Sequence, residues 1–359
     1  MTYHTWKSLL GGVVLSAAMT AAYAQGIPQI PGAPAIHGHP VVNTPKMLLW
    51  PRNAKPAAAD LTDPTADLLF DLHGNIQGRA CRNVDLVVST EGNYHMALNT
   101  LWRHVLLPRY GKTIRSWYYT TSPPVALPQL AHNNLSFGNF YLHCRPSVAI
   151  AAPRLIHKLE AHGFTEGKPI AIMRSRGNVL LVKYGNPKHI NSIWDLGRPD
   201  VHLVTPNPYN ELGAFLNYAT SIYEIAKHDK HPPKGWTANR LFNAIFNSHI
   251  KDKWLIGARI HHRDEPWSVA YGRADVAVIM YQLGKYTEAS FPHIFTLVPL
   301  GGTVADPRPL PGNEQDATYL VKIKGAFTAR QRAARRDFIK TMESKTFTRI
   351  LIKDGLTRP

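Results

Sequence analysis

The chain has 359 residues and a formal net charge of +17 at pH 7, with 41 Lys and Arg against 24 Asp and Glu. After residue 24 no stretch approaches the roughly 18 continuous apolar residues that a membrane-spanning helix needs, and no basic segment is interleaved with aromatic residues as in nucleic-acid-binding proteins. Composition therefore argues against a membrane-embedded protein and against a nucleic acid partner. The positive charge either steers anions toward a cleft or serves solubility.

Residues 1–24 have the pattern of a secretion signal. Lys7 supplies a positive charge, residues 9–22 form an apolar segment, and Ala22-Tyr23-Ala24 is a cleavage site before Gln25. We therefore predict export to a bacterial periplasm and cleavage after Ala24. Removal of 24 of the 359 residues leaves 335, enough for two lobes with separate cores.

Residues 25–60 contain seven prolines and no periodic pattern, which predicts an extended or disordered leader. From Asp85 onward, strand and helix patterns alternate, as in α/β folds with mainly parallel strands. The predicted strands cover residues 85–89, 113–120, 147–151, 178–184, 201–205, 275–281, 294–300 and 318–323. The predicted helices cover residues 94–107, 153–162, 192–197, 210–228, 239–250, 264–272, 328–343 and 345–354.

The segment after the first predicted strand is suited to binding an anion. An apolar run ends at Ser89 and Thr90, and a helical pattern begins a few residues later. The first N–H groups of a helix have no partner within it and carry a partial positive charge, so they attract anions. Glu91 adds a carboxylate beside this turn.

Other polar segments adjoin the ends of predicted strands or the starts of helices. They are Thr121-Ser122, Thr205-Pro206, His261-His262-Arg263 and Tyr281. Because the carboxyl ends of parallel strands meet at one edge of a sheet, these segments predict a cleft for a small polar ligand.

The two cysteines are predicted to form a disulfide. Cys81 lies four residues before the strand 85–89, and Cys144 lies three residues before the strand 147–151. If those strands are parallel neighbours, both sulfurs lie at the same end of the sheet. An oxidising compartment favours a structural bond over a nucleophile or a metal pair.

Several segments show a resemblance to a known family. They are Arg145-Pro-Ser-Val-Ala-Ile-Ala-Ala, Val179-Leu-Leu-Val-Lys-Tyr-Gly-Asn-Pro-Lys, Ile190-Asn-Ser-Ile-Trp-Asp-Leu, Gly272-Arg-Ala-Asp-Val-Ala-Val-Ile-Met-Tyr, and Asp337-Phe-Ile with Asp354-Gly-Leu. In order and content they resemble the type II periplasmic solute-binding proteins of ABC importers, nearest to the molybdate- and tungstate-binding branch. The resemblance extends from about residue 85 to residue 356.

The resemblance implies the two-lobed periplasmic-binding-protein fold, an α/β architecture in which each lobe is a mainly parallel sheet flanked by helices. One lobe would comprise residues 83–173 and 285–359, and the other residues 174–284. The chain would cross between them near residues 174–177 and again near residues 281–285.

The implied function is capture of a small inorganic or organic anion, such as molybdate or tungstate, by a monomer that delivers it to the permease of an inner-membrane ABC importer. No cofactor and no catalysis are implied. The family's ligand-binding positions fall on Ser89, Thr90, Thr121, Ser122, Thr205, Pro206, His262, Arg263 and Tyr281.

Two alternatives remain open from the residues themselves. Imidazole and carboxylate groups suit transition metals, so one alternative is a metal cation bound by Glu91, His261, His262, Asp264 and Tyr281. The other alternative is a hydrolase that uses Ser89 with a histidine, although no G-x-S-x-G motif is present.

We expect a bond between Cys81 and Cys144 to stabilise the folded protein by roughly 3–4 kcal/mol, because it restricts the unfolded chain. Mass spectrometry of the secreted protein with and without reductant measures the two-proton mass difference that marks the bond. Two alkylatable thiols in the unreduced protein would contradict this prediction.

Overall fold

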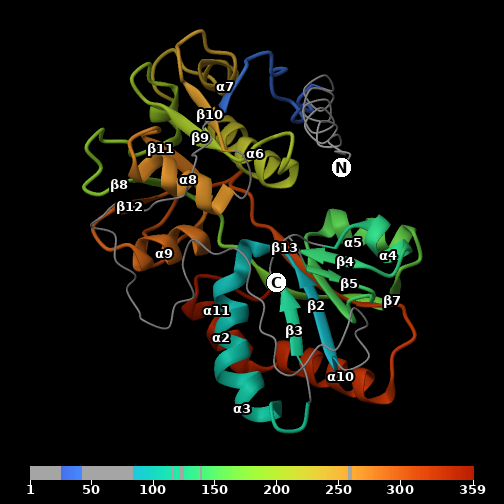
Figure 1. Ribbon diagram of the computed structural model, residues 1–359. Helices are drawn as coiled ribbons and strands as arrows, with labels where there is room; N and C mark the ends of the chain where they lie inside the picture. Colours follow the sequence, from blue (N-terminus) through green and yellow to red (C-terminus); the bar gives the residue numbers. More distant parts are fainter. Residues whose placement is uncertain (1–25, 43–83, 115–116, 121–124, 138–139, 258–260) are drawn as a thin grey trace, which may run out of the picture.

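The structure has two sheets, each flanked by helices (Figure 1). The computed structural model describes residues 26–42, 84–114, 117–120, 125–137, 140–257 and 261–359. Within these residues no helix combines the length and the apolar character required to cross a bilayer.

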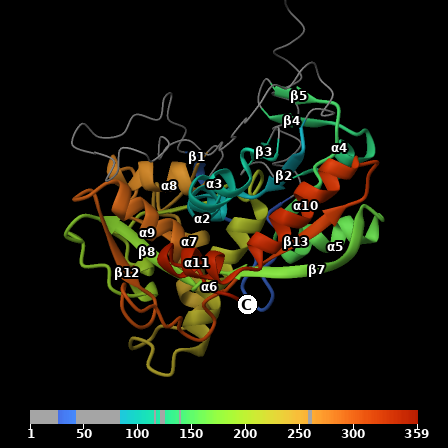
Figure 2. The same ribbon diagram turned by 90° about the horizontal axis from the view of Figure 1, so that it is seen from below.

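The first lobe contains a five-stranded sheet in the spatial order β3-β2-β6-β13-β7. Its strands β2, β13 and β7 lie in the right half of Figure 2. Strands β3, β2 and β6 run parallel, and β13 runs antiparallel to both β6 and β7. The strands are β2 (Leu86–Thr90), β3 (Trp117–Thr120), β6 (Val148–Ala151), β7 (Thr165–Arg174) and β13 (Ala317–Ile323). The remaining elements of this lobe are η2 (Gly92–Tyr94), α2 (His95–Leu101), η3 (Trp102–Leu106), α3 (Leu107–Tyr110), α4 (Leu127–Ala131), the hairpin β4 (Leu135–Phe137) and β5 (Phe140–Leu142), α5 (Pro153–Ala161), α10 (Ala329–Met342) and α11 (Lys345–Lys353).

The second lobe contains a six-stranded sheet in the order β1-β10-β9-β11-β8-β12. Strand β8 runs antiparallel to β11 and β12, and the other pairings are parallel. The strands are β1 (Val41–Val42), β8 (Asn178–Lys183), β9 (Leu203–Thr205), β10 (Trp254–Ile256), β11 (Val276–Met280) and β12 (Phe295–Pro299). The helices are η4 (Ile193–Gly197), α6 (Leu212–His228), α7 (Ala238–Phe246), α8 (His261–Ala270) and α9 (Tyr281–Ser290).

Alternating side chains of β2 explain why the first sheet is covered on both faces. Leu86 and Val88 lie in one core cluster with residues of α2, α10 and α11. Val87 lies in a different cluster, with Ile156 and Leu159 of α5. Successive side chains of a strand point to opposite faces, so the uninterrupted apolar run of β2 is typical of a strand buried on both sides.

The predicted boundary at residue 285 is wrong. Strand β12 pairs with β8, and Leu297 lies opposite Leu181 in the six-stranded sheet. Leu297 and Val298 are buried in the core of that sheet, so residues 285–300 follow the second lobe. The second crossing therefore lies between β12 and β13, whereas the first lies between β7 and β8 at residues 174–178. We propose a second lobe of about residues 175–316.

Part of the predicted leader packs on the second lobe, which corrects the expectation of an extended or disordered segment. Strand β1 pairs in parallel with β10. Ile30 is 1% exposed and belongs to the core of the six-stranded sheet. The hydroxyl of Tyr223 on α6 donates to the carbonyl of Gly32. Residues 43–60 of the predicted leader, like the predicted signal 1–24, lie outside the described residues.

The two crossings lie side by side and are joined by hydrogen bonds. The N–H of Ser175 donates to the carbonyl of Asp316 over 2.9 Å, and the N–H of Asp316 donates to Oγ of Ser175 over 3.0 Å. Nearby, Nδ2 of Asn178 lies 2.8 Å from Oδ1 of Asn217 and 2.7 Å from Oγ of Ser221, both on α6. These bonds connect the hinge between the lobes to the interior of the second lobe.

Several elements differ from the sequence prediction, and helices α4 and α9 and strands β4 and β5 were not predicted. Tyr281 begins helix α9 instead of ending a strand, and α8 begins at His261 instead of residue 264. Strand β7 was not predicted, because Gly167, Lys168 and Pro169 within it are typical of loops. Strand β10 was not predicted because it has only three residues.

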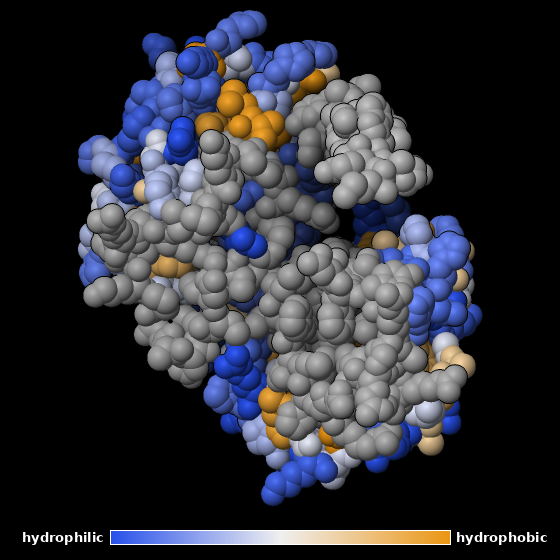
Figure 3. Space-filling view, in the orientation of Figure 1, coloured by the Kyte–Doolittle hydropathy of each residue, from blue (hydrophilic) through white to orange (hydrophobic). Residues whose placement is uncertain are grey.

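The parallel pairing of β2 and β6 confirms the premise of the predicted disulfide. Cys81 lies outside the described residues, so the bond itself stays a prediction. Among the coloured residues in Figure 3, hydrophilic ones predominate, and the apolar ones form small separate patches.

Lys253 stabilises the second lobe from within. Its side chain is almost fully buried, and Nζ donates to the carbonyls of Leu196 over 2.7 Å, of Val201 over 2.5 Å, and of Arg198. Burial lowers the pKa of Lys253 to about 8. One ammonium group therefore ties the end of η4 to the segment that enters β10.

We expect Lys253→Met to lower the free energy of unfolding by about 2–4 kcal/mol, because buried carbonyls lose their donor. The unfolded chain binds this proton more tightly, so the Lys253 contribution makes the wild type more stable as pH rises from about 8 toward 10.5. Denaturant unfolding at pH 7 and pH 9.5 measures both effects, with the exposed Lys251→Met as control. Equal stability of the Lys253 and Lys251 variants would contradict the prediction.

Candidate functional site

A cavity of about 640 Å³ lies between the two lobes. From the first lobe it is lined by the loop after β2 and by the start of α5, and from the second lobe by the starts of α6 and α8. The described residues that line it are Pro31, Glu91, Gly92, Asn93, Ala152, Pro153, Arg154, Asn210, Glu211, Gly213, Ala214, Leu216, Asn217, Thr220, His261, His262, Met280, Glu314 and Asp316.

The lining of this cavity is acidic. Among the described lining residues, four are carboxylic acids, namely Glu91, Glu211, Glu314 and Asp316, and Arg154 is the one Arg or Lys. The charge of the cavity therefore has the opposite sign to the net charge of +17 of the whole chain.

Glu91 is held at the N-terminus of helix α5. Its Oε1 accepts a hydrogen bond of 3.1 Å from the N–H of Ala152, the residue that precedes the first turn of α5. The hydroxyl of Tyr94 lies 3.5 Å from Oε2. Burial raises the pKa of Glu91 to about 7, and the bond from Ala152 opposes this rise. The carboxyl group thus changes charge near neutral pH.

Asp316 brings a second titratable group from the hinge. Burial, followed by the nearby charge of Glu314, raises the pKa of Asp316 to about 6. Nδ2 of Asn217 on α6 donates to Oδ2 of Asp316 over 2.8 Å and favours the charged form. This carboxylate therefore lines the cavity and also joins the hinge to the second lobe.

The start of α8 contributes two histidines. Nδ1 of His261 lies 3.1 Å from Oε1 of Glu211, and its Nε2 is buried without a hydrogen-bond partner. The rings of His261 and His262 have centroids 5.2 Å apart, and His262 stacks at 5.9 Å on His95 of the first lobe. Burial lowers the pKa of His262 well below its usual value and that of His95 to about 4, so both rings are neutral at pH 7.

Of the ligand-binding residues predicted from the sequence, His262 lines the cavity. Thr121 and Ser122 lie outside the described residues. Ser89 and Thr90 are fully buried within β2. The other predicted residues, Thr205, Pro206, Arg263 and Tyr281, are absent from the described lining.

Packing explains two of these differences. Oγ1 of Thr205 accepts a hydrogen bond of 2.8 Å from Nε1 of Trp254, so this hydroxyl is engaged within the second lobe. The hydroxyl of Tyr281 donates to the carbonyl of Val304 over 2.7 Å. Both hydroxyl groups are therefore engaged in hydrogen bonds within the protein.

The residues of the metal alternative are brought together only in part. Glu91, His261 and His262 line the same cavity, whereas Asp264 is buried outside its lining. Within the described residues, no group of three or more His, Cys, Asp or Glu side chains is arranged to hold a metal ion.

Sequence reasoning missed the contributions of α5, α6 and the hinge. Ala152-Pro153 had a recognisable signal, because proline is favoured in the first turn of a helix. Glu211 lies in the first turn of the predicted helix 210–228, a type of position considered above, but it was overlooked. Asp316 had no such signal, since it precedes the predicted strand 318–323 instead of following a strand. Their place depends on how the lobes face each other.

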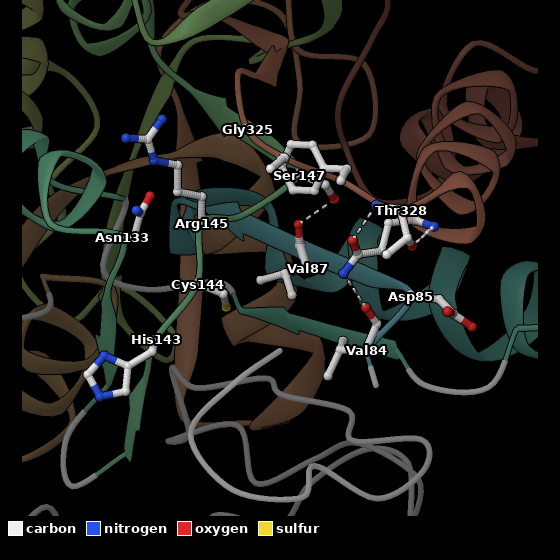
Figure 4. Close-up of a pocket in the computed structure, with 13 residues that line it drawn as sticks. Val84, Asp85, Val87, Asn133, His143, Cys144, Arg145, Ser147, Gly325 and Thr328 are labelled. Carbon is white, nitrogen blue, oxygen red and sulfur yellow. Dashed lines mark hydrogen bonds between the residues drawn. The ribbon is translucent and has the colours of Figure 1, made fainter. Parts of the chain in front are cut away.

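A second cavity, of about 630 Å³, lies at the other end of the first sheet (Figure 4). Two of its polar side chains bond to the main chain: Oγ of Ser147 donates to the carbonyl of Val87 over 3.0 Å, and Nε2 of Gln331 donates to the carbonyl of Val84 over 2.9 Å. Asp85 forms a 2.9 Å ion pair with Arg330. Because it is built from the first lobe alone, this cavity lacks the interlobe geometry of the first.

Residues 145–357 match the model of the family described as bacterial extracellular solute-binding proteins. The chain is similar in structure to the sulfate-binding protein SubI from Mycobacterium tuberculosis, with 14% identity and a TM-score of 0.52 over 78% of this chain and 87% of that one. It is also similar to AgtB from A. tumefaciens, solved with agropinic acid, with 12% identity and a TM-score of 0.52 over 76% and 82% of the two chains.

A third similar structure is the periplasmic molybdate-binding protein of Azotobacter vinelandii, with 16% identity and a TM-score of 0.49 over 76% of this chain and 99% of that one. No curated protein sequence matches the chain. The similarity to SubI and AgtB shows a shared fold and confirms the predicted two-lobed α/β architecture of periplasmic binding proteins.

We expect Glu91→Gln to change how stability depends on pH. The raised pKa of Glu91 stabilises the folded protein below about pH 4.5, and this contribution is lost as pH rises through about 7. The free energy of unfolding of Glu91→Gln should therefore rise relative to wild type by about 1–3 kcal/mol between pH 5 and pH 8.

Denaturant unfolding at several pH values measures this difference. His95 and His262 contribute with the opposite sign, and Asp316 with the same sign, but all three are present in both proteins and cancel in the comparison. Glu343→Gln, an exposed change outside the cavity lining, is the control. A constant difference across this pH range would show that Glu91 titrates normally.

Proposed function

Because the chain belongs to the family of bacterial extracellular solute-binding proteins, we propose that it captures a small solute between its lobes and delivers it to the permease of an ABC importer. We also propose that the mature protein is a periplasmic monomer and that its signal peptide is cleaved after Ala24. The observation that supports it is the cavity of about 640 Å³, whose lining combines the ends of elements from both lobes. A ligand held there contacts both lobes and so favours the closed arrangement.

We propose that the solute presents a positive charge or several N–H donors to this cavity. Four carboxyl groups and one arginine line its described part. A dianion such as molybdate would meet net repulsion while Glu91 and Asp316 are ionised, whereas an amine or metal cation gains charge-assisted hydrogen bonds or direct ligands. Glu211 and His261 lie opposite Glu91 across the lobes and offer a second contact.

A small oxyanion, the ligand predicted from the sequence, is the second candidate. One observation favours it: the pKa of Glu91 is raised to about 7 and that of Asp316 to about 6. When protonated, both groups donate hydrogen bonds and no longer repel an anion. Oxyanion binding at this site then requires proton uptake and strengthens at low pH.

Catalysis is not part of the proposal. The hydrolase alternative needs an activated Ser89, but this side chain is buried within β2 and its Oγ has no hydrogen-bond partner. A nucleophilic serine requires a base within hydrogen-bond reach. The geometry of Ser89 does not supply one.

Calorimetry distinguishes the two ligand classes. We expect a small amine such as putrescine to bind more tightly at pH 8 than at pH 5.5, because Glu91 and Asp316 ionise between these values. Glu211→Gln should weaken binding of the cation by about 10- to 100-fold, the value of one charged hydrogen bond. Glu343→Gln should leave the affinity unchanged.

Arg154→Gln tests the sign of the ligand independently. It should strengthen binding of a cation and weaken binding of an anion. Tight binding of molybdate or sulfate that improves at pH 5.5 and falls in Arg154→Gln would establish the oxyanion instead. Binding of neither class would contradict the proposed site.

A further inference from the structure

The carboxylate of Glu91 occupies the N-terminus of helix α5. This helix spans nine residues, Pro153–Ala161. The N–H groups of Leu155 and Ile156 bond to the carbonyl of Ala152, and Pro153 has no N–H. The N–H of Ala152 donates to Oε1 of Glu91 over 3.1 Å.

The register of the first sheet dictates this position. Strands β2 and β6 are parallel neighbours, with Ser89 opposite Ala149 and Thr90 opposite Ile150. Continuation of this register brings Glu91, the residue after β2, next to the start of α5. Because Glu91 directly follows β2, its carboxylate is held close to the start of α5 by the chain itself and binds there as an intramolecular anion.

The same cavity is lined by a residue with an unpartnered polar atom, Nε2 of His261. His261 is only 5% exposed and lines the cavity, while its Nε2 forms no hydrogen bond with the described residues. The nearby charge of His261 also lowers the pKa of Glu91. A buried polar atom without a partner at a cavity wall is typical of a position that a ligand completes. On the second lobe, Nε2 of His261 is therefore available to a ligand. On the first lobe, the N–H of Ala152 is already occupied by Glu91.

We propose that Glu91 is a specificity-determining residue that excludes anionic solutes by occupying the position at the start of α5 where an anion would bind. The proposal rests on the proposed function, in that the interlobe cavity is the solute site. In wild type, an anion must displace a covalently attached carboxylate and then lie beside its charge. A cation instead finds the carboxylate already oriented by Ala152.

Three variants distinguish occupation of the start of α5 by Glu91 from the effect of negative charge in the cavity. Glu91→Ala removes the charge and leaves the N–H of Ala152 without its partner. Glu91→Gln removes the charge, but its amide oxygen still accepts from Ala152. Glu211→Ala removes one carboxylate from the same cavity without uncovering α5. Circular dichroism and thermal unfolding establish that each variant is folded.

Calorimetry with sodium molybdate and sodium sulfate at pH 8 tests the proposal. We expect Glu91→Ala to bind one of these oxyanions at least about tenfold more tightly than wild type, the value of one charge-assisted hydrogen bond regained. Glu91→Gln should gain less, and Glu211→Ala should gain least. Equal gains in Glu91→Ala and Glu211→Ala would show that net charge alone acts and would overturn the proposal.

Other outcomes distinguish this proposal from the proposed function. If wild type already binds molybdate tightly at pH 8 and Glu91→Ala binds it no better, Glu91 does not exclude anions, although the receptor function stands. If no variant binds any oxyanion while wild type binds a cation, the exclusion by Glu91 is likewise wrong. If Glu91→Ala gains oxyanion affinity while wild type binds no cation, the specificity role stands and the cationic ligand is wrong.

Discussion

The paired hydrogen bonds between Ser175 and Asp316 hold the two interlobe crossings together, and the arrangement of the site depends on them. They bring the end of β7 beside the start of β13, so both lobes extend from one narrow hinge. Because the carboxylate of Asp316 lines the cavity and accepts from Asn217, the hinge also belongs to the ligand site. A change of charge at this carboxylate therefore acts on the ligand and on the lobe contacts together.

The local charge of the cavity and the total charge of the chain have opposite signs. The excess of 41 basic over 24 acidic side chains was consistent with either attraction of anions or solubility. Four carboxyl groups nevertheless gather between the lobes, and Glu91 fills the position at the start of α5 where an anion would be stabilised. Contacts at a few ångströms dominate specificity, whereas the net charge acts over longer distances and is screened by salt. The net charge of the chain therefore affects solubility and the approach of a ligand more than it affects which ligand is bound.

Much of the fold was predictable because it depends on local patterns. The apolar run of β2, the alternation of strands and helices and the proline that begins α5 act within about ten residues of sequence. The errors arose where tertiary contacts decide: β12 joins the second lobe because Leu297 packs there, and β1 becomes a strand only because β10 provides a partner. Of the candidate site, Glu91, His261 and His262 were grouped in the metal alternative and line one cavity, whereas Asp264 of the same group lies outside its lining. Which members of such a group meet depends on how the lobes pack.

The sequence by itself determined the two-lobed α/β architecture, the strand ends that supply polar groups, and the presence of carboxylate and imidazole side chains near those ends. Only the tertiary structure decided which of these groups meet. Thr205 and Tyr281 are engaged by Trp254 and Val304, while Glu211 and Asp316 enter the cavity from the start of α6 and from the hinge. The reason is that hydrophobic periodicity specifies which face of each element is buried, whereas the packing of one lobe against the other selects the few polar groups that remain to face a ligand.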